Sequence, residues 1–203
     1  MSIDTPTGDQ EHTRFGRLPA LAELERFFLL DDADHALVAR RRGDHNRLGF
    51  ALQLGTVRYL GTFLADPTDV PDLVVDYVAE QVGAADPSCL KRYMERRSTR
   101  FEHTAEIAAT CGYRDFTSAE AELSRWIDDR AWTTGDGPSA LSEGAVAWLR
   151  ERQILLPGTS RLERLVARIR DAATQRLWDV LTALLTPAHA QRLELLLEVE
   201  GGQ

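Results

Sequence analysis

Arginine side chains gather in three short stretches of this sequence, and the guanidinium group suits phosphate because it donates parallel hydrogen bonds. The first stretch, residues 40–61, carries five arginines against the single acid Asp44, so its local net charge is +4. Amide side chains in the same stretch could read base edges, since each presents a donor beside an acceptor. The candidates for nucleic-acid contact in this stretch are Arg40, Arg41, Arg42, Asn46, Arg47, Gln53 and Arg58.

Two further basic stretches follow. In residues 91–102, five basic side chains oppose two acids, and the candidates are Lys91, Arg92, Arg96, Arg97 and Arg100. After the turn at residues 157–158, a capped helix would place arginines on one face beside exposed amides, which suits phosphate. The candidates there are Thr159, Ser160, Arg161, Arg164 and Arg168. For each stretch the alternative is a solvated face of an amphipathic helix.

Residues 103–113 have the spacing of a helix-turn-helix. Ala108 is a small residue four positions before Gly112, as needed where two helices cross and the chain turns. The helix from Thr117 would then enter the major groove, with Arg114 in the turn as a further contact. Ordinary packing of two helices is the alternative.

An all-α fold of about eight to ten helices would position these side chains, because apolar residues recur at three- and four-residue spacing. Asp31 and Asp44 are expected to cap the second and third helices. A strand is the alternative for the valine-rich segment after Pro71, but its period near 3.6 favours a helix. The four tryptophans lie among helical apolar residues and are expected in the core.

Residues 84–88 combine small residues with a proline and predict a joint between two packed helical modules. The modules would span residues 13–85 and 86–199, the second containing the segment like a helix-turn-helix. Residues 1–12 and 200–203 are expected to be flexible, because they are short of apolar side chains.

The chain of 203 residues is acidic, with a net charge of −8. This charge disfavours nucleic-acid binding, because neutralised phosphates supply most non-specific affinity. The acids are concentrated, however: residues 63–86 contain six of them and no lysine or arginine. We therefore expect one basic face and an acidic opposite face.

Other classes of protein are disfavoured. No apolar run reaches the roughly 18 residues of a membrane helix, and residues 1–11 lack the apolar segment of a secretory signal, so we expect a cytoplasmic location and no membrane partner. Cys89 and Cys111 predict reduced thiols rather than a disulfide framework or zinc site. The acidic segment 31–35 lacks the glycine and distal glutamate of a calcium loop. We expect no cofactor and no metal.

Three segments resemble the region near the amino terminus of transposases of the Tn-three family, the large replicative enzymes of bacterial class II transposons. They are residues 41–64 (RRGDHNRLGFALQLGTVRYLGTFL), residues 93–116 (Tyr93-x-x-x-Arg97-x-Thr99-Arg100-x-x-His103, then Gly112-Tyr113-Arg114-x-Phe116) and residues 155–165 (LLPGTSRLERL). The resemblance extends from about residue 15 to about residue 185.

This resemblance implies a helical region that binds double-stranded DNA at the terminal inverted repeats and positions the rest of the transposase there. The catalytic Asp-Asp-Glu centre of the family lies much further along the chain, so the resemblance implies binding without cutting, joining or a magnesium site. The alternative is an acidic helical module for protein interaction or regulation that does not bind DNA. Salt dependence separates the two, because phosphate contacts weaken as salt rises.

Overall fold

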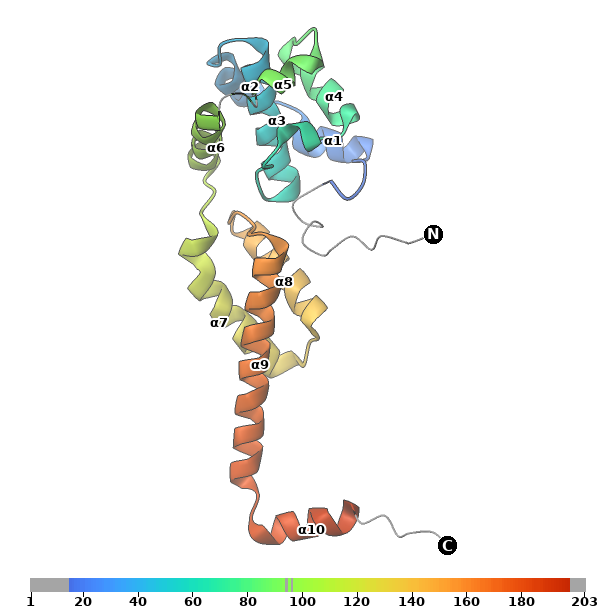
Figure 1. Cartoon of the computed structure of the whole chain (residues 1–203), viewed down its shortest axis with the longest axis vertical. Helices are drawn as coiled ribbons and strands as arrows, with labels where there is room; N and C mark the ends of the chain where they lie inside the picture. Colours follow the sequence, from blue (N-terminus) through green and yellow to red (C-terminus); the bar gives the residue numbers. More distant parts are fainter. Residues whose placement is uncertain (1–14, 94, 96, 198–203) are drawn as a thin grey trace, which may run out of the picture.

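The computed structural model describes residues 15–93, 95 and 97–197, and these residues form an elongated, all-helical molecule (Figure 1). Helices α1 to α6 make one body, α7, α8 and the first half of α9 make a second, and α9 continues beyond it to α10. The helices are α1 (Leu21–Phe28), α2 (Asp32–Ala39), α3 (Asp44–Leu60), α4 (Asp72–Val82), α5 (Leu90–Tyr93), α6 (Arg97–Cys111), α7 (Phe116–Thr134), α8 (Pro138–Glu151), α9 (Thr159–Leu184) and α10 (Pro187–Leu197), with short 3-10 turns at Pro67–Asp69 and Pro87–Cys89. The all-α prediction is confirmed.

Helix α3 is the centre of the first body, and every residue from 48 to 57 is buried. It begins after Gly43, whose φ of +81° favours glycine, so the prediction that Asp44 caps this helix is wrong. Asp44 is instead the first helical residue, and its carboxylate pairs with Arg47. The helix ends at Gly61, which is in the left-handed region.

Two glycines inside α3 allow aromatic rings to approach its backbone. A Cβ atom added at Gly49 would lie 2.4 Å from Cγ of Tyr93, and one at Gly55 would lie 2.3 Å from Cδ1 of Phe28. Both rings are fully buried, so neither can swing aside freely. The close packing of α3 in the first core therefore depends on the missing side chains.

We expect Gly49→Ala to lower the free energy of unfolding by about 1–3 kcal/mol, since overpacking at the face of Tyr93 outweighs the gain in helix propensity. Urea unfolding of the purified variant measures this loss. Gly144→Ala in α8 is the matched control, because its Cβ would meet only the far edge of the half-buried Trp126 ring, at 2.9 Å. A Gly49→Ala variant as stable as the parent would contradict the packing described.

Other helix starts and stops test the sequence predictions. The side chain of Asp31 accepts a hydrogen bond from the Asp34 amide at 2.8 Å, which confirms the cap of α2. The segment after Pro71 is helical, and Gly112 stops α6 with a φ of +73°. Helix α7 begins at Phe116, one residue before the expected Thr117, and is capped by Asp115, whose side chain accepts a hydrogen bond from the Thr117 amide at 2.8 Å.

The buried residues form two clusters. The first contains α1 to α5 and also Ile107 of α6, and the second is built from α7, α8 and the first half of α9. The predicted joint at residues 84–88 falls inside the first cluster, because Leu90 and Tyr93 beyond it are buried there. The chain passes from the first cluster to the second between Tyr113 and Phe116.

The two bodies are joined by hydrogen bonds as well as by the chain. The Arg114 amide donates to the Gln153 carbonyl at 2.8 Å, and the Leu156 amide donates to the Gly61 carbonyl at 2.9 Å. The Arg150 guanidinium donates to the Leu60 carbonyl at 3.0 Å. The bonds to Leu60 and Gly61 attach the end of α3 to α8 and to the segment that follows α8, and the Arg114 bond attaches that segment to the link between α6 and α7. Within the described part of the chain, no helix is both long and apolar enough to span a membrane.

Candidate nucleic-acid interface

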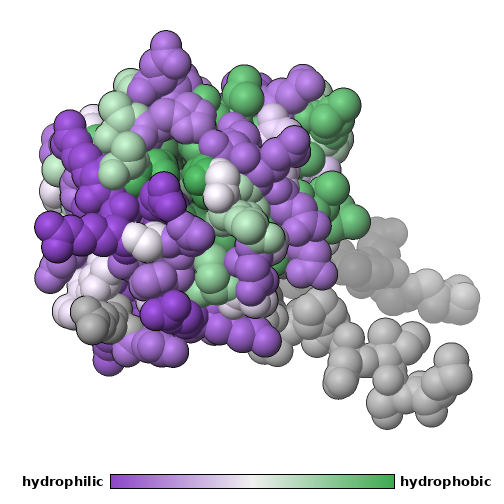
Figure 2. All heavy atoms as spheres, turned by 90° about the horizontal axis from the view of Figure 1, so that it is seen from above, coloured by the Kyte–Doolittle hydropathy of each residue, from purple (hydrophilic) through white to green (hydrophobic). Residues whose placement is uncertain are grey.

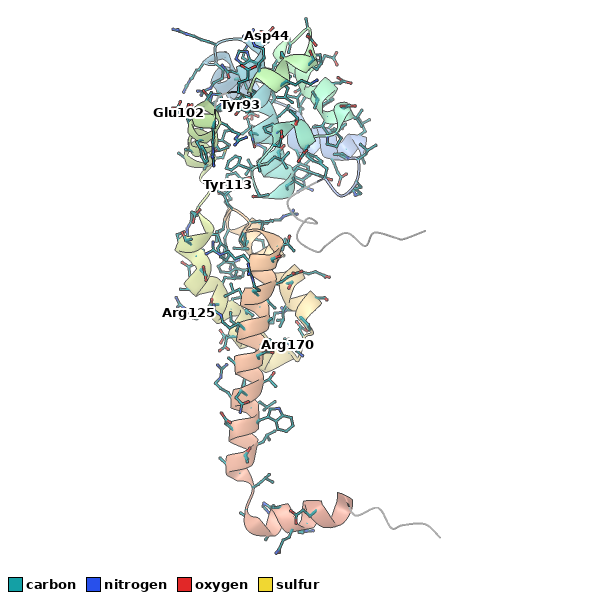
Figure 3. All side chains as sticks on the ribbon, viewed as in Figure 1. Asp44, Tyr93, Glu102, Tyr113, Arg125 and Arg170 are labelled. Atoms are coloured by element: carbon teal, nitrogen blue, oxygen red, sulfur yellow. The ribbon has the colours of Figure 1, made fainter. Side chains whose placement is uncertain are left out.

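The first two basic stretches meet at the start of α3. They line a cavity of about 310 Å³, which we call the basic cleft. It is lined by Arg42, His45, Asn46, Arg92, Tyr93, Glu95 and Thr99. Asn46 is held by a hydrogen bond from Nδ2 to the Arg42 carbonyl at 2.8 Å, while the Arg42 and Arg92 side chains are exposed. Figure 3 labels Asp44 and Tyr93 at this end of the molecule.

The end of the first body is polar on its outside. Figure 2 views the molecule from this end: hydrophilic side chains cover much of the face, and apolar ones run from its centre to one side. A phosphate backbone could approach over the hydrophilic part of this face. The arrangement offers two guanidinium groups and one amide from separate parts of the sequence, which suits phosphate and base-edge contacts.

A second cleft lies between the two bodies and was not foreseen. It has a volume of about 630 Å³, and we call it the junction cleft. Arg26 of α1 and Arg150 of α8 line it from opposite bodies, and both are exposed. The Arg26 guanidinium lies 5.1 Å from the centre of the Phe27 ring. The remaining lining residues are Val57, Arg58, Tyr59, Gly61, Tyr113, Glu151, Gln153 and Ile154.

Two arginines predicted to contact DNA are bound within the fold. Arg58 forms a two-pronged pair with the buried Asp34, both N–O distances being 2.7 Å, and this hydrogen bonding raises the pKa of Arg58. Arg41 pairs with Glu106 of α6, and its guanidinium lies 4.4 Å from the centre of the Phe50 ring. Both guanidinium groups pair with carboxylates elsewhere in the fold, so both side chains hold helices together, and Arg58 also lines the junction cleft.

Gln53 is also internal. Only 1% of it is exposed, and its Nε2 donates to the Leu64 carbonyl at 3.1 Å. The prediction that Gln53 reads a base is therefore at odds with its position in the folded chain. Its amide ties the middle of α3 to the loop that follows the helix.

Three other candidate arginines form ion pairs on the surface. Arg47 pairs with Asp44, Arg114 with Glu122 at 3.3 Å, and Arg161 with Glu120 at 2.7 Å. Exposed pairs of this kind contribute only about 0–1 kcal/mol, so a phosphate could replace the carboxylate at little cost. Their role in binding stays a prediction.

The remaining candidates are placed as follows. Arg40, Lys91, Arg97, Arg164 and Arg168 have exposed side chains, and Arg100 is half-buried. The third stretch belongs to the second body, where Gly158, and not Thr159 or Ser160, is the N-cap of α9. Thr159 is buried and Ser160 half-buried. Arg96 lies outside the described residues.

The helix-turn-helix segment has an unexpected environment. Helix α6 packs against α3, whereas α7 packs against α8 and α9 (Figure 1). The apolar faces of α6 and α7 are thus buried by different partners, and not chiefly by one another as the motif requires. Which helix enters a groove stays a prediction.

A buried polar side chain, His103 of α6, lies against Tyr93 of the basic cleft. Its Nδ1 lies 3.1 Å from the Tyr93 hydroxyl, and its ring is edge-on to Phe50 at 5.2 Å. Burial, and then the positive charge of Arg41, lower the pKa of His103 to about 4. His103 is therefore neutral at pH 7 and helps to fix α6 against α3.

The residues that the structure describes form neither a metal site nor a site with a reactive cysteine. They contain no group of three or more histidine, cysteine or acidic residues that could hold a metal ion. Cys89 and Cys111 are free and half-buried, and burial raises the pKa of both thiols. Neither cysteine is activated as a nucleophile.

Comparison with known proteins shows which family the sequence belongs to. A family model described as a domain of unknown function, DUF4158, matches residues 8–169. The chain belongs to the DUF4158 family. This DUF4158 chain is 42% identical to the transposase for transposon gamma-delta of Escherichia coli K12, over the whole of this chain and 21% of that protein.

Other transposases are similar as well. The DUF4158 chain is 35% identical to the transposase for Tn501 of Pseudomonas aeruginosa (94% of this chain, 20% of that protein) and 33% identical to that for Tn1546 of Enterococcus faecium (84% and 17%). The chain thus spans about a fifth of the length of these relatives. The resemblance to the amino-terminal region of Tn-three family transposases is confirmed.

Proposed function

We propose that this chain is the part of a Tn-three family transposase that binds double-stranded DNA at the terminal inverted repeats, without cutting or joining strands. The observation that carries the proposal is the basic cleft, which brings Arg42, Asn46 and Arg92 together from two stretches of an acidic chain. The similarity to transposases supports a role in transposition. Because the chain matches only about a fifth of each relative's length, most of each relative lies outside the match, which agrees with a part that does not cut or join strands.

The junction cleft extends the proposed surface. It lies at the opposite end of α3 from the basic cleft, and a 17-residue helix is about 25 Å long. At roughly 3.4 Å per base pair, that length corresponds to about seven base pairs. We propose that Arg26 and Arg150 contact phosphates there, which would let both bodies hold one stretch of duplex.

The test is an electrophoretic mobility shift with a duplex carrying the transposon's own inverted repeat, compared with a scrambled duplex over a range of salt. Tighter binding to the repeat, falling steeply with salt, is the expected result. Equal affinity for both duplexes would leave only non-specific attraction. No affinity for either would favour the alternative of a protein-interaction module.

We expect Arg92→Gln to weaken binding to every duplex and to make the slope of log affinity against log salt less steep by about one, because one phosphate contact is lost. The same mobility-shift series measures it. Arg125→Gln on α7, far from the basic cleft in Figure 3, is the matched control and should leave the slope unchanged. Equal losses in the two variants would show that charge alone, and not the basic cleft, attracts the DNA.

A further inference from the structure

The second half of α9 presents an apolar surface that nothing in the described chain covers. In the first half, Leu162, Leu165 and Val166 are buried against α7 and α8, and Ala173 is the last buried residue. Beyond it, α9 projects past both helices (Figure 1). Six large apolar residues, between 43% and 69% exposed, form what we call the distal α9 face: Leu177, Trp178, Val180, Leu181, Leu184 and Leu185.

The distal α9 face continues the buried stripe of the same helix. At 3.6 residues per turn, Leu177, Val180 and Leu184 lie within about 60° of Leu162 around the helix axis. The side of α9 that packs against α7 and α8 is therefore the side left open further along. Trp178, which the sequence predicted to be in a core, is on this open segment and is 60% exposed.

The width of the apolar arc indicates what kind of surface covers it. Leu181 and Trp178 extend the stripe to an arc of about 160°, with Gln175 and Asp179 on the opposite side, and Leu185 follows as the C-cap of the helix. A two-stranded coiled coil uses a narrower seam, whereas an arc this broad is typical of a helix packed into a bundle. The partner should therefore contact α9 from more than one direction.

The distal α9 face is short along the helix axis, which argues against a second copy of the chain as its partner. Residues 177–185 span only about 12 Å of helix, and two such segments would bury far less than the roughly 1,200 Å² of a stable interface. The DUF4158 match ends at residue 169, near the last buried residue of α9. The gamma-delta transposase, similar over the whole of this chain, has nearly four-fifths of its length beyond the matched region.

We propose that the distal α9 face is the docking surface for a helical segment of the larger transposase, downstream of the region that this chain matches. The second half of α9 then belongs structurally to the next domain, and α9 is a rigid link between that domain and the DUF4158 bodies. The proposal rests on family membership and on apolar packing, and not on DNA binding.

Accessibility of an introduced thiol tests the proposal. Leu184→Cys is labelled with a maleimide in the 203-residue chain and in a gamma-delta transposase whose matching fifth is replaced by this chain. We expect labelling at position 184 to be slower by about tenfold or more in the long protein. Leu73→Cys on α4, which is 48% exposed, should react equally fast in both. Ala173→Cys, at a buried position, should stay protected in both and reports that α9 is folded.

Equal labelling of position 184 in the two proteins, with Ala173→Cys protected in both, would overturn the proposal. A second result would also overturn it: position 184 is already labelled slowly in the 203-residue chain, and light scattering gives that chain the mass of a dimer. The partner would then be a second copy. Because Arg42 and Arg92 are on the other body, either outcome leaves the DNA-binding test unaffected.

Discussion

Replacing Asp34 with alanine is expected to lower the free energy of unfolding by about 3–5 kcal/mol, because it leaves the half-buried Arg58 guanidinium without its carboxylate. Asp34 is 4% exposed, so water cannot readily take its place. The substitution also removes the hydrogen bond that the Asp31 amide donates to Asp34 at the start of α2. The first loss loosens α2 from α3, and the second frays the start of α2.

Urea unfolding followed by circular dichroism measures the loss. Asp32→Ala is the matched control, since Asp32 is an exposed acid two positions before Asp34 on α2 and should change stability by less than about 0.5 kcal/mol. Adding Arg58→Met to Asp34→Ala should restore part of the loss, because no unpaired charge then remains buried. An Asp34→Ala variant of normal stability with tighter DNA binding would instead support the sequence prediction that Arg58 contacts DNA, because the freed guanidinium could then pair with a phosphate.

The Asp34–Arg58 pair shows where sequence reasoning stops. Local rules predicted the helices well: Asp31 caps α2, and Gly112 ends α6. The partner of a charged side chain is not a local property, because Arg58 and Asp34 are 24 positions apart and Arg41 and Glu106 are 65 apart. The arginine stretches were visible in the sequence. The ion pairs that engage Arg41 and Arg58 within the fold depend on tertiary packing, which the sequence pattern does not show.

The boundary between bodies and the junction cleft depend on the same kind of information. Residues 84–88 carry the small residues and proline of a joint, yet Leu90 and Tyr93 fold back into the first cluster. Arg26 and Arg150 lie far apart in sequence and in no basic stretch, so no pattern could pair them. The basic cleft was easier to anticipate, because both contributing stretches are dense in arginine.

Acidification is expected to destabilise the first body through His103. Burial lowers the pKa of His103 to about 4 in the folded chain, against about 6.5 when the chain is unfolded. Between these values the unfolded chain binds a proton that the folded chain does not, so stability falls as pH falls. The contribution of His103 is fully present above about pH 6.5, and about 3 kcal/mol of it is lost by pH 4.

The surroundings of His103 explain why it resists a proton. The ring is buried, with Nδ1 3.1 Å from the Tyr93 hydroxyl, and a protonated ring would lose its hydration and face the positive charge of Arg41. Glu106 opposes this effect, but its carboxylate is already paired with Arg41. The Tyr93 hydroxyl stays protonated throughout, because burial raises its pKa.

Urea unfolding of the parent chain and of His103→Gln between pH 7 and pH 4 isolates this effect. The variant should start less stable at pH 7, since it loses the ring contacts with Phe50 and Tyr93, but its stability should fall less with pH. Surface carboxylates such as Asp86 and Asp115, whose hydrogen bonds with Ser88 and Thr117 lower their pKa, affect both proteins equally and cancel in the comparison. Parallel stability curves would mean that His103 takes up its proton without unfolding, and the contact between α6 and α3 would then have to tolerate a charged imidazole beside Arg41.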